Sequence, residues 1–336
     1  MSDDEVDAEL LELLRHHLQG KIDIQEEPET GVLESAEYVY DSCIDVAVDM
    51  RASKKAAENI YKQMQEKSYS TATWSEHELH PKAKDEATVN FIFTMDLLNF
   101  SFWSDLPDDE RFAIEYRGQR WTGYWSLVAA LQRALDEEEE IPLLEERLHC
   151  LREAGQVLSK HYDGSVAELV YAADGSAARL VNLLAQDFDC FRDEHRFEDG
   201  KMIRLMKRAQ ILVADLWACF NGESYGEFRD IDKITMFADY RIPQILMTMG
   251  ALYCSPAVAA AIKDKKMIES GCSWELQIRA CSIWCVELIR REILRQHPDA
   301  YVNAILIDFF LYDSMKELEA AGKEPIPHHR TRSIWY

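Results

Sequence analysis

The stretch KMIRLMKRAQILVADLWACF, residues 201–220, decides the fold class. Its apolar side chains recur at steps of three and four residues, the spacing that places them on one face of an α-helix. These side chains are Met202, Ile203, Met206, Ala209, Val213 and Trp217. The pattern predicts a long amphipathic helix over 201–220 that packs against a hydrophobic core.

Helical spacing continues along most of the chain. It covers residues 31–65, and two long helices are expected at about 273–296 and 299–321. Ser165 and Glu168 form a capping box, and another helix is expected to start near Ser176. These signals predict a mainly α protein.

One segment has a different pattern. Residues 111–125 form two short runs around a turn at 117–119 and predict a small β-hairpin, followed by a helix over 125–135. No internal repeat and no Gly/Ser/Pro linker divides the chain. We therefore expect an acidic, partly helical leader at 1–29 and a single helical domain over 30–336.

No charged residue occurs between Arg241 and Lys263, a run long enough to suggest a membrane span. However, Gly250 and Ser255-Pro256 divide the run, and Ser followed by Pro is typical of a helix start. Two short buried helices are the better prediction, with no membrane association.

Net charge excludes several function classes. The 336 residues include 37 basic and 61 acidic side chains, a net charge of −24. Proteins that bind nucleic acid gather Lys and Arg, because counterion release supplies much of the affinity. Binding to DNA, RNA or an anionic membrane is therefore not expected, although a local basic pocket could hold one small phosphate.

Eight cysteines are scattered without a CxxC pair, which fits neither a disulfide framework nor a zinc site. Cys281 and Cys285, four residues apart in an apolar run, are expected to be core thiols. Reduced cysteines and the lack of a signal peptide predict a cytoplasmic protein, with the nucleus as an alternative.

Two charged residues, one before a predicted helix and one in the middle of another, are candidates for chemistry. Asp239 precedes the helix expected over 243–252. It either caps that helix or pairs with Arg241, or it lies ionised in a pocket and stabilises or attacks a sugar cation. Lys207 is either a solvated flank of its helix or a cation directed at a phosphate. The local sequence leaves these alternatives open.

The segment 96–103 places Asp96 and Asn99 among aromatic residues, where polar groups are costly to bury unless they are hydrogen-bonded. It is either core with two caps or a slot for a planar heterocycle. In the second case Phe100 or Trp103 would stack on the ring while Asp or Asn reads its edge.

Other signals favour structure over chemistry or are absent. Glu275, Arg279 and Glu287 are expected to form a buried ion-pair network of structural role. The motifs GxGxxG, GxxxxGK[ST] and HExxH do not occur. Their absence argues against the usual dinucleotide enzymes, P-loop NTPases and zinc proteases.

Several long stretches together resemble the queuosine salvage protein family, the queuosine 5′-phosphate N-glycosylase/hydrolases. They are NFIFTMDLLNFSFW (90–103), RGQRWTGYWSLVAAL (117–131), MKRAQILVADLW (206–217), TMFADYRIPQIL (235–246), WELQIRACSIWCVELI (274–289), IDFFLYD (307–313) and HHRTRSIWY (328–336). They occur in order from about residue 35 to the end of the sequence.

This resemblance implies a helical fold similar to helix-hairpin-helix DNA glycosylases, with a small β insertion. It implies hydrolysis of queuosine 5′-phosphate to queuine and ribose 5-phosphate without metal or cofactor. Asp239 would be the catalytic carboxylate, and Lys207 would lie near the ribose phosphate. The candidate substrate-binding residues are Asp96, Asn99, Phe100, Trp103, Tyr124, Trp125, Tyr240, Arg241 and Tyr336.

The expected partner is the small-molecule substrate alone, bound by a monomer. One alternative is a DNA-repair base glycosylase, which the net charge and the missing Gly-rich hairpin disfavour. The other is a non-catalytic helical nucleoside-binding or interaction protein, whose pocket carboxylates would be structural pairs.

Overall fold

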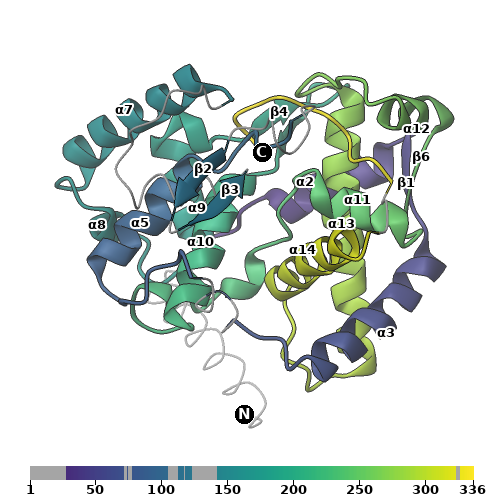
Figure 1. The fold of residues 1–336 in the computed structure, drawn as a ribbon, viewed down its shortest axis with the longest axis horizontal. Coiled ribbons are helices and arrows are strands. Elements are labelled where there is room, and N and C mark those ends of the chain that lie inside the picture. The colour runs from purple at the N-terminus through teal and green to yellow at the C-terminus, as the bar shows by residue number, and fades with distance from the viewer. Residues whose placement is uncertain are drawn as a thin grey trace, which may run out of the picture.

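The computed structural model describes residues 28–71, 74, 78–104, 113–116, 118–122, 142–322 and 326–336. The predicted leader up to residue 27 and the predicted helix 125–135 lie outside these residues. The fold is mainly helical, as predicted (Figure 1). The helices are α2 (Val32–Ser42), α3 (Met50–Glu66), α5 (Glu86–Leu97), α7 (Leu144–His161), α8 (Val166–Ala172), α9 (Ala177–Asp187), α10 (Lys207–Phe220), α11 (Arg241–Thr248), α12 (Pro256–Lys263), α13 (Ser273–Gln296) and α14 (Ala304–Ala320).

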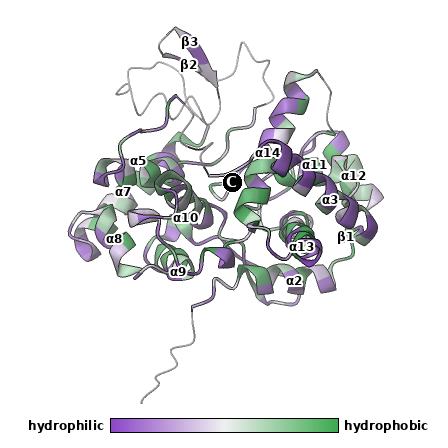
Figure 2. Cartoon of the chain, turned by 90° about the horizontal axis from the view of Figure 1, so that it is seen from below, coloured by the Kyte–Doolittle hydropathy of each residue, from purple (hydrophilic) through white to green (hydrophobic). Residues whose placement is uncertain are grey.

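The helices pack as two groups that share one hydrophobic core. In the first helix group, α10 lies against α5 and α9, and α5 contacts α7 and α8. In the second helix group, α13 packs against α2, α3, α11 and α14. Figures 1 and 2 show the first group on one side of the molecule and the second on the other. Buried apolar side chains from both groups form one continuous cluster.

Within the described ranges, the strands form three small antiparallel sheets, of which we predicted only one. The predicted hairpin is present as β2 (Ala113–Tyr116) and β3 (Gln119–Thr122), which stand at one edge of the molecule in Figure 2. In addition, β1 (Val46–Val48) pairs with β6 (Leu252–Cys254), and β4 (Glu194–Arg196) pairs with β5 (Met202–Arg204). The prediction of a single extended segment was therefore wrong.

These strands correct two helix predictions. Residues 31–65 do not form one helix: β1 separates α2 from α3, and the Asp49 side chain caps α3 by accepting the Ala52 N–H at 2.7 Å. Residues 201–220 are helical only from Lys207, because Met206 has a left-handed backbone (φ 50°) that ends the extended segment β5. Periodicity alone could not reveal these backbone reversals.

Several predicted helix ends are confirmed. The Ser165 and Ser176 side chains accept backbone N–H groups of Glu168 and Arg179 and cap α8 and α9. Ser255 caps α12, whose first residue is Pro256, as the division of the uncharged run predicted. Among the described residues, none of the helices combines the length and apolarity that crossing a membrane requires.

Candidate active site

A cavity of about 1070 Å³ lies where the two helix groups meet. Its walls come from the segment after α5, from α10 and α11, from the segment before α11, from α14 and from the C-terminal tail after residue 326. Residues of these walls are Asn99, Phe100, Phe102, Trp103, Lys207, Ile211, Asp215, Phe237, Asp239, Tyr240, Arg241, Gln244, Asp308, Phe309, Tyr312, Asp313, Lys316, Glu319, His328, Arg330 and Tyr336. Most of the predicted site residues thus share one cavity.

The loop 234–240, which carries Asp239, is fixed by three helices. On the α10 side, the Gln210 side chain accepts the Thr235 N–H at 2.9 Å. On the α14 side, Asp308 Oδ2 accepts the Phe237 N–H at 2.9 Å. From α13, Arg279 Nε donates to the Ala238 carbonyl at 2.8 Å. Because all three bonds are buried, the backbone next to Asp239 is held on every side.

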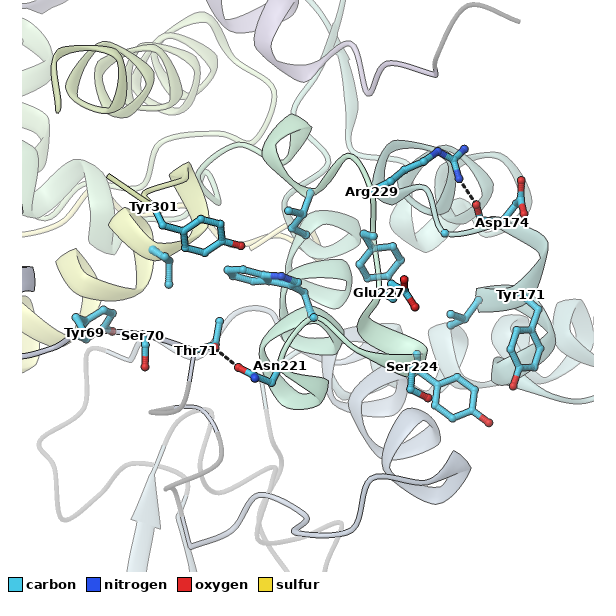
Figure 3. Close-up of a pocket in the computed structure, with 18 residues that line it drawn as sticks. Tyr69, Ser70, Thr71, Tyr171, Asp174, Asn221, Ser224, Glu227, Arg229 and Tyr301 are labelled. Carbon is cyan, nitrogen blue, oxygen red and sulfur yellow. Dashed lines mark hydrogen bonds between the residues drawn. The ribbon is translucent and has the colours of Figure 1, made fainter. Parts of the chain in front are cut away.

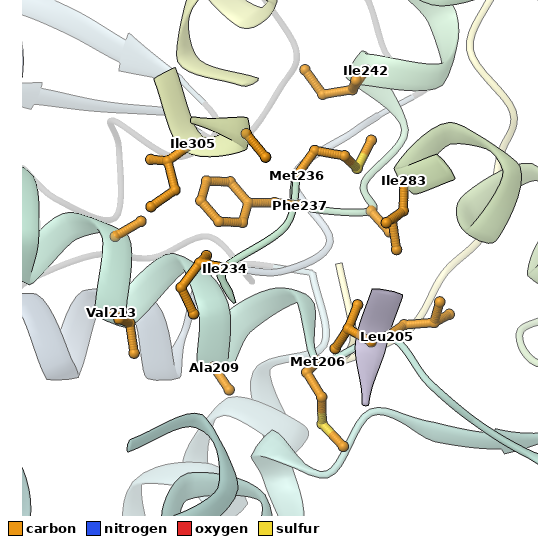
Figure 4. Close-up of a cluster of buried hydrophobic side chains, with 14 of the residues drawn as sticks. Leu205, Met206, Ala209, Val213, Ile234, Met236, Phe237, Ile242, Ile283 and Ile305 are labelled. Atoms are coloured by element: carbon orange, nitrogen blue, oxygen red, sulfur yellow. The ribbon is translucent and has the colours of Figure 1, made fainter. Parts of the chain in front are cut away.

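Apolar side chains of the same loop pack into the hydrophobic core. Ile234, Met236 and Phe237 are buried, and Figure 4 shows them among side chains of α10, α11, α13 and α14. Each of these side chains contributes about 1.5–3 kcal/mol when it is fully removed from water. The loop is therefore part of the core, while Phe237 and residues 239–241 line the cavity.

Asp239 lies half-buried at the start of α11. Its Oδ1 atom accepts the N–H groups of Arg241 at 2.8 Å and Ile242 at 3.0 Å. Burial raises its pKa, while the Lys207 ammonium and the two backbone N–H groups oppose this rise. The side chain thus performs the capping role and faces the cavity at the same time, so the two alternatives from the sequence are not exclusive.

Lys207 is the first residue of α10 and is only 5% exposed, so it is not a solvated flank. Its Nζ atom lies 3.3 Å from the Asn99 carbonyl oxygen, to which it donates. Burial lowers the pKa of Lys207 to about 8, against the attraction of Asp239. Its backbone N–H donates to Asp193 Oδ2 at 3.2 Å, which compensates for the lack of a side-chain cap at Met206.

A second group of buried charges, here called the arginine cluster, consists of Asp193, Glu275 and Arg279. Arg279 donates to both Asp193 oxygens, at 3.1 and 2.6 Å, and to Glu275 at 3.2 Å. Burial alone would raise the pKa of Asp193, but Arg279 and a His195 hydrogen bond hold it well below its usual value. The predicted network is present for Glu275, whereas the inclusion of Glu287 was wrong: Glu287 pairs with Arg290 and Arg291.

The arginine cluster also reaches the candidate site. Asp193 binds the backbone of Lys207, and Arg279 binds the backbone of the residue before Asp239. One ion-paired unit therefore fixes the positions of both residues relative to each other.

Around Lys207 lies a different set of charges, here called the lysine cluster: Lys207, Asp96, Asp215, Asp239 and Asp308. Burial raises the pKa of each carboxyl group in this set, to about 7 for Asp215. Asp96 is fully buried and does not line the cavity; its Oδ1 accepts from Asn99 at 3.5 Å and its Oδ2 has no hydrogen-bond partner. Four carboxyl groups thus surround a single ammonium.

The rings of the aromatic segment are largely occupied by the protein itself. Phe100 is fully buried, with the guanidinium carbons of Arg147 and Arg208 at 4.3 and 4.9 Å from its ring centre. Trp103 is 7% exposed, and Arg332 lies 3.8 Å from its ring centre. These cation–π contacts stabilise the segment but leave little of either ring free for a base.

Other predicted residues lie at the cavity in different ways. Tyr240 is half-buried, with its ring 4.6 Å from that of His328. Arg241 lines the cavity but binds Glu319. Tyr336 is buried, and its main-chain oxygen accepts the Ser101 N–H at 3.1 Å, which ties the tail to the aromatic segment. Tyr124 and Trp125 lie outside the described residues.

Sequence reasoning missed Asp215, Asp308 and His328 as cavity residues. Asp215 and Asp308 each stand alone among apolar residues in helical runs, in VADLW and LIDFF, and an isolated acid on an apolar face was the available signal. His328 gave no such signal; burial lowers its pKa to about 4, so that it is neutral at pH 7.

A second cavity, of about 950 Å³, shares Tyr69 with the first, and Figure 3 shows its lining residues. Tyrosines line it, among them Tyr171 and Tyr301, and Tyr301 is 73% exposed. Among its described lining residues the only cation is Arg229, which donates to the Asp174 carbonyl oxygen. It holds no buried lysine beside a carboxylate, so the first cavity is the better candidate for catalysis.

Comparisons with known proteins agree with this choice of class. A family model described as "Queuosine salvage protein" matches residues 79–141 and 136–336. The chain is 41% identical to the queuosine 5′-phosphate N-glycosylase/hydrolase of Schizosaccharomyces pombe, over 91% of this chain and 99% of that protein. The proteins of the same name from Mus musculus and Sphaerobacter thermophilus are 38% and 35% identical, over 92% and 91% of this chain and 99% and 98% of theirs. The chain belongs to the queuosine salvage protein family.

Proposed function

We propose that this chain is a queuosine 5′-phosphate N-glycosylase/hydrolase, an enzyme that cleaves the N-glycosidic bond and releases queuine for salvage. Relatives that match nearly their whole length carry this name. The observation that carries the proposal is the pair Asp239 and Lys207, held at one cavity by hydrogen bonds to the backbone.

Asp239 is proposed as the catalytic carboxylate. Cleavage of the bond to ribose develops positive charge on the sugar, and a preorganised carboxylate stabilises this charge strongly in a site that excludes water. The two backbone N–H groups on Oδ1 and the nearby ammonium favour the ionised form. Both attack on C1′ by the carboxylate and activation of water by it are compatible with this placement.

Lys207 is proposed to interact with two negative charges, the Asp239 carboxylate and the ribose phosphate of the substrate. Its ammonium favours the ionised form of Asp239, and it is a buried cation at the cavity that the ribose phosphate of the substrate could approach. Because its pKa is about 8, the ammonium form prevails at pH 7 and is lost above this value. Activity is therefore expected to fall as the pH rises through about 8.

The two rival functions are supported less well. A DNA-repair glycosylase would need a basic surface, whereas the net charge is −24; the similarity to helix-hairpin-helix glycosylases remains a prediction about the fold. A non-catalytic interaction protein would not need carboxyl groups with raised pKa values around a cavity. We further propose that residues 30–336 act as one domain, as a monomer in the cytoplasm.

The direct test is incubation of the purified protein with queuosine 5′-phosphate, followed by detection of queuine by mass spectrometry. Wild type is expected to release the base, and Asp239→Asn to be slowed by at least about 100-fold. Glu317→Gln, which changes an exposed residue of α14, is the matched control. If wild type releases no base, or Asp239→Asn releases it equally fast, the proposal is wrong.

The role of Lys207 has its own readout. Lys207→Ala is expected to lower activity on queuosine 5′-phosphate more than on queuosine, because the nucleoside lacks the phosphate that the ammonium would bind. The ratio of the two values of kcat/KM measures this preference. An unchanged ratio would refute the phosphate role while leaving the support of Asp239 intact.

A further inference from the structure

Asp308 differs from the other acidic side chains of the cavity. It lies in the second turn of α14, lines the cavity with Asp239 and Lys207, and is 5% exposed. Its Oδ2 atom accepts the Phe237 N–H at 2.9 Å, which fixes the carboxyl group against the loop that carries Asp239. Asp308 thus belongs to the lysine cluster, and it comes from the helix group opposite to that of Lys207.

The second carboxyl oxygen of Asp308 is available. Among the described residues, Asp308 has no ion pair and no hydrogen bond besides the one from Phe237. By contrast, Asp313 accepts the Tyr69 hydroxyl at 2.6 Å and Glu319 pairs with Arg241. A buried carboxyl group with a free oxygen at a cavity calls for a ligand partner.

The charge state of Asp308 also differs from that of Asp239. Burial raises the pKa of Asp308 well above its usual value, and the nearby Asp239 charge raises it further, against the Phe237 N–H and Lys207. Asp239 has two N–H donors where Asp308 has one. Two neighbouring carboxyl groups whose environments separate their proton affinities are suited to opposite roles, one ionised and one protonated.

We propose that Asp308 is the acid that protonates the departing base; this role rests on the proposed N-glycosidase activity. A base with carbon at position 7 cannot be activated by protonation there, so the proton must reach a nitrogen or the carbonyl oxygen elsewhere on the heterocycle. A protonated Asp308 at the cavity supplies such a donor, whereas Asp239 faces the sugar as the anion.

The step balances without a co-reactant. The bond between C1′ and the base nitrogen breaks, and its electron pair goes to the base. The Asp308 O–H proton moves to the base, which leaves neutral, and Asp308 becomes a carboxylate. Water adds to C1′ and loses one proton, which restores the acid; the sum is nucleotide plus water to free base plus ribose 5-phosphate.

The test compares two leaving groups in wild type and Asp308→Asn. Asn keeps the shape and the acceptor for Phe237 but is not an acid. With queuosine 5′-phosphate, kcat should fall by about 100-fold or more, the usual contribution of a general acid. With 4-nitrophenyl ribofuranoside 5-phosphate, whose leaving group departs as a stable anion, kcat should fall by less than about tenfold.

Two further variants complete the design. Asp308→Glu keeps an acid and should slow the nucleotide reaction less than Asn does; Glu317→Gln controls for loss of an acidic side chain on α14. Equal slowing of both substrates by Asp308→Asn would assign Asp308 a positioning role and overturn the inference, as would no slowing of either. Release of queuine by wild type is scored separately, because its absence overturns the proposed function itself.

Discussion

The arginine cluster and the lysine cluster both contact the loop 234–240, and they differ in how their buried charges are compensated. In the arginine cluster, one guanidinium faces two carboxylates, and hydrogen bonds of 2.6–3.2 Å join it to both. In the lysine cluster, one ammonium faces four carboxyl groups, and within the part of the chain that the structure describes its one hydrogen bond to an oxygen is to the Asn99 carbonyl. The charges of the arginine cluster are largely compensated by hydrogen bonds among its own members, whereas those of the lysine cluster are not.

This difference separates a structural role from a functional one. Desolvated charges are retained at low cost only when geometry and hydrogen bonding compensate for them. Where the compensation is incomplete and a cavity adjoins, the raised or lowered pKa values point to a site that a substrate completes. The arginine cluster then has the structural role, because it holds the backbone at Lys207 and next to Asp239.

The largest expected effect is a loss of stability when the arginine cluster is disrupted. Arg279→Met would leave Asp193 and Glu275 as buried carboxylates without the guanidinium that pairs with both, which should cost about 3–5 kcal/mol of unfolding free energy. Urea unfolding followed by circular dichroism measures this loss. Arg291→Met, on the same helix with a half-exposed ion pair to Glu287, is the control and should cost no more than about 1 kcal/mol. Equal losses would remove the distinction between the two clusters.

A smaller effect concerns the pH dependence of stability. Lys207 has a pKa of about 8 when folded, below its ordinary value of 10.5. Between these values the unfolded chain binds more protons, so the destabilisation from Lys207 is complete below about pH 8 and is relieved as the pH rises toward 10.5. From pH 7 to pH 10, wild type should gain about 2 kcal/mol relative to Lys207→Met.

The measurement is urea unfolding of both proteins at a series of pH values. Subtracting the variant removes the contributions of other groups that titrate in this range. A difference that stays constant with pH would mean that Lys207 is not desolvated in the way that its burial indicates.

The sequence predicted the helical class, the caps at Ser165, Ser176 and Ser255, and the hairpin, because each depends on local spacing or local hydrogen bonds. It could not predict β1 and β6 or the short strands before α10, because these pair segments distant in sequence or depend on one left-handed residue, Met206. Short apolar runs fit either structure until their partners are known.

The site residues likewise fall into those that the sequence could indicate and those that depend on contacts between distant segments. Asp239 was accessible because it precedes a predicted helix start, where backbone N–H groups favour a negative charge, whereas Lys207 was indicated by the resemblance of MKRAQILVADLW to the family. Asp308 was not, because its meaning depends on the approach of α14 to the loop before α11. The stacking slot expected from Phe100 and Trp103 depended on ring faces that Arg147, Arg208 and Arg332 cover in the fold.

The central claim is that the buried charge of Asp239 in the lysine cluster lowers the stability of the fold and is required for catalysis. It is tested most directly by measuring kcat on queuosine 5′-phosphate and the unfolding free energy for Asp239→Asn. Because burial raises the pKa of Asp239, its charge disfavours the fold at neutral pH. The variant should therefore lose at least about 100-fold in kcat while its stability stays equal or rises by up to about 1 kcal/mol. Retained activity, or a loss of stability above about 2 kcal/mol, would contradict the account.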